Sequence, residues 1–292
     1  MKKVSIIIGN SASITEEAIN KFGFIIVPFI MEWPEGESLK GGNIFEKMRE
    51  AEKQNIKTTP KTSQPSMGTF KKAFEEGLKD SEKILAITIS SGISGTYNSA
   101  IQAKKLFDDE AQKRIFIIDS FNADLSESLL AIKAMEMIEQ GKTVEETYEY
   151  LKTILPKVFL FAMLESPKWL EAGGRLSHAV SVILTQMQKI GMRPILSMKD
   201  GVIKPANLRM KANDTADALF KQFEDVTKKP FSENKTCRVA ISHADNLEAA
   251  QKLRTLIEDK YPQIKVEFIS LTSMVIGCHV GPGTVLCCSI ED

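Results

Sequence analysis

The feature that most constrains the fold is an alternation of β-branched runs with stretches of helical periodicity in the first half of the chain. Four short runs have the composition of buried strands, at residues 4–8, 24–29, 84–89 and 115–118. After the last of them, apolar residues recur at helical spacing, at Leu125, Leu129, Ile132 and Met135. Because strands that alternate with helices form parallel sheets, we predict an α/β domain with a largely parallel sheet and helices on both faces.

From residue 158 onward the pattern is more mixed. A predicted strand at 158–163 precedes a break at Gly173 and Gly174, and a hairpin is predicted to turn at Asp200 and Gly201. The other predicted elements are helices over 180–190, 215–223 and 246–259, strands at 238–242 and 265–269, and a glycine-rich terminal segment. The 292 residues are about twice the roughly 150 of a usual domain, so we expect two α/β domains, residues 1–157 and 158–292.

Composition excludes several classes of protein. The 38 basic residues equal the 38 acidic ones and form no long basic block, which excludes a nucleic-acid-binding protein. Apolar windows are of strand length, short of the ~18 residues of a membrane helix, and the run at 4–8 is too short for a secretory signal. The four cysteines form no CxxC motif and the three histidines are scattered. We therefore expect a cytoplasmic protein without a structural metal ion.

Loops rich in small polar residues follow three of the predicted strands, at residues 9–13, 90–99 and 119–124. In an open parallel sheet, the loops at the carboxyl ends of the strands form the ligand-binding crevice. These loops are therefore candidate site loops, and Ser11 is the candidate ligand-binding residue of the first.

The segment KTTPKTSQPSMGTF, residues 57–70, concentrates hydroxyl groups and prolines ahead of a predicted helix. Ser66 has the position of a helix N-cap, whereas Thr62 and Ser63 offer hydroxyl donors on a loop stiffened by proline. Ligand binding and plain helix capping both remain open for these residues.

The segment ISSGISGTYNSA, residues 89–100, follows a predicted strand and opens a helix. Backbone N–H groups near Gly95 and the Ser94 hydroxyl would surround a positive helix end, which suits a carboxylate or a phosphate. The G-x-S-x-G elbow of serine hydrolases is not matched, because Thr96 replaces the last glycine. Neither G-x-G-x-x-G nor the P-loop pattern occurs, so we predict no nucleotide cofactor.

Glycines flank two further candidates. His279 lies in GCHVGPG, where Gly281 and its neighbours would let backbone and imidazole approach a ligand closely. Arg175 follows Gly173 and Gly174, and is either a cation presented to a partner or an ordinary solvated loop residue.

Taken together, six motifs in order resemble the DegV family along nearly the whole chain. They are TSQPS from 62, ISSGISGTYNSA from 89, DS from 119, GGRLS from 173, RPIL with a later G-x-I over 193–203, and GCHVGPG from 277. The resemblance implies a two-domain α/β protein that holds a long-chain fatty acid between its domains. In some bacteria such proteins are the lipid-presenting subunit of fatty acid kinase, which acts with a separate ATP-binding subunit.

The resemblance also implies roles for individual residues. Thr62 and Ser94 match the hydroxyl pair that holds the fatty acid carboxylate, and His279 matches the head-group histidine. Arg209 matches a second head-group arginine more loosely, and Arg175 matches an exposed arginine linked to partner docking.

The chain departs from the family at Asn10, because family members usually have Asp-Ser after the first strand. Loss of that carboxylate would alter either the hydrogen bonds of the head group or the set of protons available during phosphoryl transfer.

Two classes of function compete. The first is a binding protein that buries one acyl chain and presents its carboxylate to a kinase without turnover of its own; residues 158–164, 180–190 and 195–203 would line the acyl tunnel. The second is an esterase or thioesterase with Ser94 as nucleophile and His279 as base. The unmatched elbow and the lack of an orienting acid for His279 favour the first.

Overall fold

The computed structural model describes residues 2–209, 214–232 and 236–291. The chain forms two compact units, each assembled from three stretches. The first unit comprises Met1–Ile30, Ser63–Val158 and Lys199–Val202, and the second comprises Met31–Thr62, Phe159–Met198 and Ile203–Asp292. The predicted division at 157/158 lies one residue before the crossing at 158/159, whereas residues 31–62 group with the second unit and residues 199–202 with the first.

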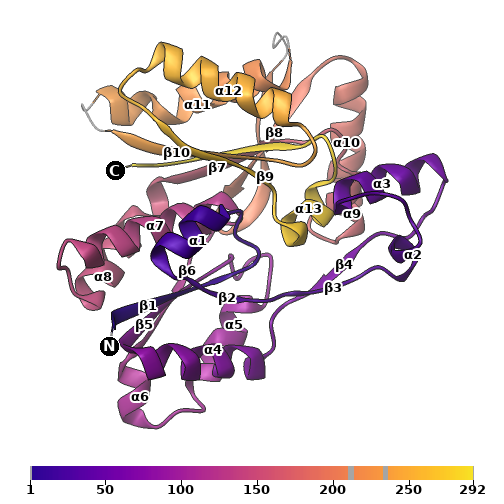
Figure 1. The fold of residues 1–292 in the computed structure, drawn as a ribbon. Coiled ribbons are helices and arrows are strands. Elements are labelled where there is room, and N and C mark those ends of the chain that lie inside the picture. The colour runs from indigo at the N-terminus through magenta and orange to yellow at the C-terminus, as the bar shows by residue number, and fades with distance from the viewer. Residues whose placement is uncertain (1, 210–213, 233–235, 292) are drawn as a thin grey trace. The chain divides into compact units, whose positions relative to one another are not determined.

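The first unit contains a four-stranded parallel sheet in the order β2-β1-β5-β6. Its strands are β1 (Lys2–Gly9), β2 (Ile25–Val27), β5 (Ser81–Thr88) and β6 (Ile115–Asp119). Helices α4 (Met67–Asp80) and α5 (Thr96–Lys104) cover one face, and α1 (Glu16–Phe22), α7 (Leu125–Glu139) and α8 (Val144–Ile154) lie on the other (Figure 1). The predicted parallel sheet with helices on both faces is confirmed.

Alternation along the strands explains this layering, because successive side chains point to opposite faces. On the face of α4 and α5, Ile7 and Ile84 pack with Phe70 and Phe74 in a core whose members are at most 7% exposed. Burial of each such side chain stabilises the fold by about 1.5–3 kcal/mol relative to exposure. Ser66 is the N-cap of α4, as predicted, and accepts a hydrogen bond from the Thr69 N–H at 3.1 Å.

The strand order reverses direction between β1 and β5, since β2 lies on one side of β1 whereas β5 and β6 lie on the other. In open parallel sheets the crevice at such a reversal, at the carboxyl ends of the strands, is the usual ligand site. The loops after β1 and β5 are those that carry Ser11 and Ser94.

The second unit contains a six-stranded mixed sheet in the order β11-β10-β12-β7-β8-β9. Its strands are β7 (Val158–Met163), β8 (Arg193–Lys199), β9 (Val202–Arg209), β10 (Cys237–His243), β11 (Val266–Leu271) and β12 (Val285–Glu291). Helices α11 (Thr215–Ser232) and α12 (Leu247–Lys260) pack on this sheet through a core that includes Phe161, Phe223 and Leu253. The β8–β9 hairpin turns at Asp200 (φ 54°) and Gly201 (φ 77°), as predicted.

Several elements lie outside the predicted pattern. The glycine-rich terminal segment forms α13 (Met274–Val280) and β12, which lies inside the sheet between β10 and β7. The segment 31–62, which groups with the second unit, contains the helices α2 (Pro34–Glu37) and α3 (Ile44–Lys53). At its two ends lie the strands β3 (Ile30–Glu32) and β4 (Lys61–Ser63), which pair with each other. The remaining short elements are α6 (Asp109–Lys113), the 3₁₀ turn at Leu155–Lys157, and α9 (Lys168–Ala172). Helix α10 (His178–Lys189) occupies the predicted helical stretch.

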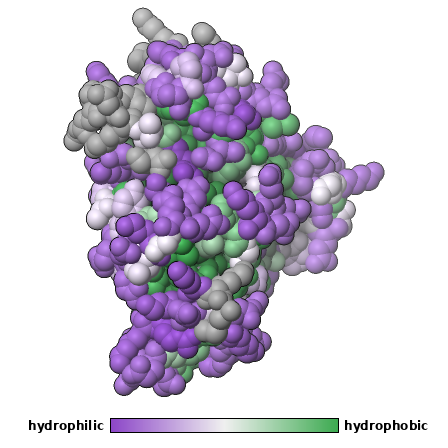
Figure 2. Space-filling model, turned by 60° about the vertical axis from the view of Figure 1, so that its left-hand side comes forward, coloured by the Kyte–Doolittle hydropathy of each residue, from purple (hydrophilic) through white to green (hydrophobic). Residues whose placement is uncertain are grey.

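Among the residues described, no helix combines the length and the apolar character needed to cross a membrane. The face shown in Figure 2 is largely hydrophilic, with hydrophobic residues in smaller areas between. Helix α10 exposes two large apolar side chains, Val182 and Ile183, at 43% and 52%.

Candidate functional site

Two of the predicted head-group residues meet within the second unit. Thr62 lies on β4, His279 lies on α13, and the Thr62 Oγ1 and His279 Nε2 atoms are 2.7 Å apart. The histidine is buried, with 8% of its surface exposed. A hydroxyl and an imidazole separated by 217 positions in the sequence thus form one polar pair at an otherwise apolar helix.

Burial and a neighbouring cation keep His279 neutral. Loss of hydration, together with the smaller effect of the positive charge of Arg175, lowers the pKa of His279 to about 4. Arg175 is itself half-buried, and its Nη1 donates to the Gly173 carbonyl. It is therefore less exposed than expected of a solvated loop residue, and its charge acts on the histidine.

Three glycines let helices α9 and α3 pack closely against the helix that carries His279. A Cβ at Gly173 would lie 2.3 Å from His279 Nδ1, and one at Gly281 (φ 79°) would lie 2.0 Å from Trp169 Cδ1. A Cβ at Gly277 would lie 2.4 Å from the Phe45 ring of α3. We predicted that Gly281 lets a ligand approach; in the structure, the close approach at this glycine is made by the indole of α9.

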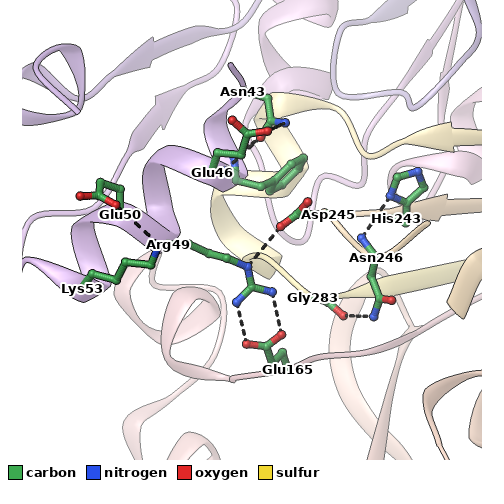
Figure 3. Close-up of polar contacts among 11 residues, drawn as sticks. Asn43, Glu46, Arg49, Glu50, Lys53, Glu165, His243, Asp245, Asn246 and Gly283 are labelled. Atoms are coloured by element: carbon green, nitrogen blue, oxygen red, sulfur yellow. Dashed lines mark hydrogen bonds and ion pairs between the residues drawn. The ribbon is translucent and has the colours of Figure 1, made fainter. Parts of the chain in front are cut away.

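An ion-pair cluster around Arg49, absent from the sequence-based predictions, fixes α3 to the rest of the second unit (Figure 3); we call it the Arg49 clamp. Arg49 donates from Nη1 and Nη2 to the two Glu165 carboxylate oxygens at 3.0 and 2.9 Å, and from Nε to Asp245 at 3.2 Å. Glu165 follows β7 and Asp245 follows β10, so one guanidinium ties α3 to the ends of two strands. Paired, parallel N–H···O bonds of this kind fix orientation as well as distance.

In the first unit, Ser94 and Gly95 lie in the turn that opens α5. The Ser94 and Thr96 hydroxyl oxygens are 2.8 Å apart, and the Ser94 N–H donates to the Ser90 carbonyl at 3.1 Å. A Cβ at Gly95 would lie 2.3 Å from the Gln64 side-chain oxygen. Gly95 therefore makes room for the Gln64 amide, and Ser94 presents a half-buried hydroxyl at the carboxyl end of β5.

Ser11 is fully buried against a carboxyl group that the sequence analysis missed. Its hydroxyl donates to Glu127 Oε1 and Oε2 at 3.1 and 3.0 Å, and burial raises the pKa of Glu127 well above its ordinary value. The neighbouring Asn10 accepts a hydrogen bond from the Phe29 N–H through Oδ1 at 2.8 Å. A side-chain amide thus supplies the acceptor that an aspartate would supply after this strand.

Two predicted site residues remain, Ser63 and Arg209. Ser63 ends β4, is exposed, and groups with the first unit. Arg209 is the last residue of β9, and its side chain lies outside what the structure describes.

Each unit contains one sizeable pocket among those described. A pocket of about 260 Å³ in the second unit is bordered by Met163, Leu164, Gln188 and Met192, which come from or adjoin two of the predicted tunnel stretches. A pocket of about 410 Å³ in the first unit lies between β2 and α4, bordered by Ile25, Val27 and Ala73 with Lys72 and Glu76.

Comparison with known proteins decides the family. The family model described as "Uncharacterised protein, DegV family" matches residues 3–292. The chain belongs to the DegV family. The resemblance deduced from the six motifs is therefore confirmed over nearly the whole chain.

Relatives of this DegV family member include proteins named for fatty acids. A "Fatty acid-binding protein" of Thermotoga maritima is 29% identical, over 97% of this chain and 96% of the relative. The crystal structure of DegV from Bacillus subtilis, described as a fatty acid binding protein, has a TM-score of 0.79 at 26% identity and covers 100% of both chains. A DegV family protein from Thermus thermophilus has the same fold, with a TM-score of 0.83 at 22% identity, over 99% of this chain and 100% of that one.

The described geometry gives the hydrolase alternative no support. A general base needs a nucleophile on one ring nitrogen and an orienting acid on the other. At His279 the Nε2 atom contacts Thr62, and the Nδ1 atom lies against the backbone at Gly173. No carboxylate is recorded beside this imidazole within the described part of the chain.

Proposed function

We propose that this DegV family member binds a long-chain fatty acid and presents its carboxylate to a separate ATP-binding kinase subunit, without turnover of its own. The observation that carries the proposal is the pair formed by the half-buried Thr62 and the buried, neutral His279, 2.7 Å apart, in a chain whose relatives are named fatty acid-binding proteins. The protein then acts as a carrier, and the chemistry of activation belongs to the partner.

A carboxylate at the mouth of an apolar tunnel needs several hydrogen-bond donors, because a buried charge without partners is costly. The family motifs assign this role to the Thr62 and Ser94 hydroxyls, to His279, and more loosely to Arg209. The Thr62 Oγ1 and His279 Nε2 atoms lie 2.7 Å apart, which supports a shared role for the two side chains at one head group. Hydrogen bonds to a charged acceptor are the stronger kind, about 1.5–3 kcal/mol each.

The acyl chain would supply most of the affinity. Burial of about 16 methylenes at ~0.8 kcal/mol each gives on the order of 12 kcal/mol before ordering costs, which suffices for tight capture without a covalent bond. We assign the tunnel to residues 158–164, 180–190 and 195–203. The 260 Å³ pocket bordered by Met163, Leu164 and Gln188 supports this assignment at two of the three stretches.

Native mass spectrometry of protein purified from cells tests the binding step. We expect a species heavier than the chain by the mass of one long-chain fatty acid, and loss of that mass on denaturation. An acyl mass that survives denaturation on Ser94 would indicate an acyl-enzyme and a hydrolase. A chain that carries no lipid and binds none on titration would overturn the proposal.

The kinase step needs a second measurement. Loaded protein, ATP and a fatty acid kinase subunit should yield an acyl phosphate, as the carboxylate oxygen attacks the γ-phosphorus and ADP leaves. Hydroxylamine traps the acyl phosphate as a hydroxamate. If the protein binds lipid but no hydroxamate forms with an active kinase subunit, the proposed partnership with a kinase is wrong and the proposed lipid binding still stands.

A further inference from the structure

The tip of the β8–β9 hairpin belongs to the first unit and anchors the loop that carries Ser94. Ser90 is fully buried, and its Oγ donates to the Gly201 carbonyl at 2.7 Å. Gly201 is the second residue of the hairpin turn, with a φ of 77° that favours glycine. The tip is therefore held by a hydrogen bond that solvent does not reach.

The same serine organises the loop on its other side. The Ser90 hydroxyl accepts the Gly92 N–H at 3.1 Å, and the Ser90 carbonyl accepts the N–H groups of Ile93 and Ser94 at 3.2 and 3.1 Å. Ser90 also donates its own N–H to the Asn122 carbonyl at 2.7 Å. Ser90 thus links the hairpin tip directly to the backbone of Ser94, because it is hydrogen-bonded to both.

Two glycines make this contact sterically possible. A Cβ at Gly92 would lie 2.5 Å from the Gly201 oxygen and 3.0 Å from its carbonyl carbon. A Cβ at Gly201 would lie 2.8 Å from Ser90 Oγ. Because the atoms opposite Gly92 are backbone atoms, a side chain there could be accommodated only if the tip or the loop moved.

We infer that Ser90 and Gly92 are positioning residues for the fatty acid head group, because they fix the Ser94 loop to the hairpin tip at Gly201. The inference rests on the proposed function, which gives Ser94 a hydrogen bond to the carboxylate. Hydrogen bonds weaken steeply when distance or angle departs from a narrow range, so a single loop hydroxyl needs a rigid support. Ser90 and Gly92 provide that support without touching the ligand.

A double-mutant cycle tests the inference on delipidated full-length protein titrated with palmitate. Ser94→Ala should weaken binding about tenfold, as expected for one lost hydrogen bond to a charged group. Ser90→Ala and Gly92→Ala should each weaken binding about fivefold in the wild-type background, but less than about twofold in the Ser94→Ala background. Effects that vanish with Ser94 show that both residues act through it.

Ser81→Ala is the matched control. Ser81 is also fully buried, lies at the opposite end of β5, and donates to the Gly77 carbonyl at 2.7 Å. Ser81→Ala, which removes this hydroxyl, should lower the melting temperature about as much as Ser90→Ala does and should leave the palmitate affinity unchanged. Gly92→Ala keeps the Ser90 hydroxyl, so it gives an answer even where Ser90→Ala fails to fold.

Failure of the inference and failure of the proposed function look different. Wild-type affinity in Ser90→Ala and Gly92→Ala, or equal losses with and without the Ser94 hydroxyl, would overturn the positioning role while fatty acid binding stands. Unchanged affinity in Ser94→Ala overturns it too, since there is then no head-group contact to position. Absence of palmitate binding in the wild-type chain would overturn the proposed function itself.

Discussion

A histidine kept neutral by its surroundings changes what a carboxylate ligand meets. At His279 the cost of removing water from a charged ring outweighs any benefit of protonation, and the nearby Arg175 adds repulsion. The ring therefore enters a complex with one N–H group rather than two. Under the proposed function, positive charge for the head group would come from a different side chain, such as an arginine, whose guanidinium stays charged at all relevant pH values.

This depressed pKa predicts how stability depends on pH. The unfolded chain protonates His279 near 6.5 and the folded chain only near 4, so between these values the unfolded state binds more protons. The free energy of unfolding should fall as pH drops through this window, by roughly 3 kcal/mol in total from this residue. Urea titrations of delipidated protein at pH 7 and 4.5 measure it.

The control for that titration is a second histidine. His279→Gln should lose this part of the pH dependence, whereas His178→Gln should keep it, because the His178 side chain is 80% exposed. The same fall in stability in the wild type and in His279→Gln would contradict the prediction.

Thr62 gives a second prediction at this scale. Thr62→Ala should weaken fatty acid binding by about 1–3 kcal/mol, because it removes a hydrogen bond to a charged group and leaves His279 Nε2 without its 2.7 Å partner. Thr62→Ser keeps the hydroxyl and should retain most of the affinity in calorimetric titrations. If the two variants weaken binding equally, the methyl group and its packing are responsible, and the hydroxyl has no head-group role.

At the scale of elements, α3 depends on Arg49 for its attachment to two strand ends. Arg49→Ala should lower the free energy of unfolding by about 1 kcal/mol, a modest value because the Arg49, Glu165 and Asp245 side chains are 33%, 53% and 40% exposed. Arg49→Lys should lose most of the same amount, since an ammonium group cannot reproduce the paired geometry. Denaturant midpoints measure both.

A helix-surface arginine provides the comparison for Arg49. Arg254 pairs with Glu258 one turn away at 3.1 Å, and Arg254→Ala should cost only about 0.3–0.5 kcal/mol. Molar salt should shrink the Arg49 effect toward this value by screening its charges. An Arg49→Ala effect no larger than the Arg254→Ala effect at low salt would mean that the clamp adds nothing to the attachment of α3.

The elements that were predictable are those with a clear period. Strands β1, β5 and β6 alternate with helices and have β-branched runs, and the hairpin turn carries the Asp-Gly pair that favours positive φ at both positions. Strand β12 has no such signal, because it lies between two other strands, is buried on both faces from Val285 to Ile290, and follows a glycine-rich segment. Uniform burial removes the alternation by which a strand is recognised.

The site was predictable only as separate motifs. The sequence indicates that Thr62 and His279 are suited to a head group, but their contact spans 217 positions and depends on how α9 and α3 pack on α13. The Arg49 clamp and the Glu127 partner of Ser11 also depend on tertiary structure, and each residue has the local setting of an ordinary helix surface charge. Local periodicity contains no information about such pairs.

At the scale of the whole molecule, neither unit is a continuous piece of chain. Each is built from three stretches, and the first includes a hairpin tip supplied from the second half. A boundary read from length and composition assumes contiguous domains, so it does not anticipate that residues 31–62 group with the second unit and residues 199–202 with the first. A fragment ending at 157 would lack the Gly201 carbonyl that Ser90 binds, so experiments on this protein need the full chain.

The prediction at this scale concerns Arg175, which the family motif links to docking of a partner. A fixed charge and a planar fork are suited to carboxylates or phosphates of another protein. Its Nη1 donates to the Gly173 carbonyl, a backbone contact that orients the guanidinium. Arg175→Ala should therefore stay folded and loaded with lipid, while acyl phosphate formation by a kinase subunit falls about tenfold, as expected for loss of one charge-assisted contact.

Two readouts separate docking from a direct role in the head group. Lipid occupancy of purified Arg175→Ala, by native mass spectrometry, should equal that of the wild type, and loss of the ligand would mean that Arg175 clamps the carboxylate. The pKa of His279, followed by NMR, should rise in the same variant, because the charge that lowers it is gone. Arg175→Lys keeps the charge but not the fork, so it should restore the pKa and leave kinase coupling impaired. Full coupling in Arg175→Ala would place the docking surface elsewhere on the molecule.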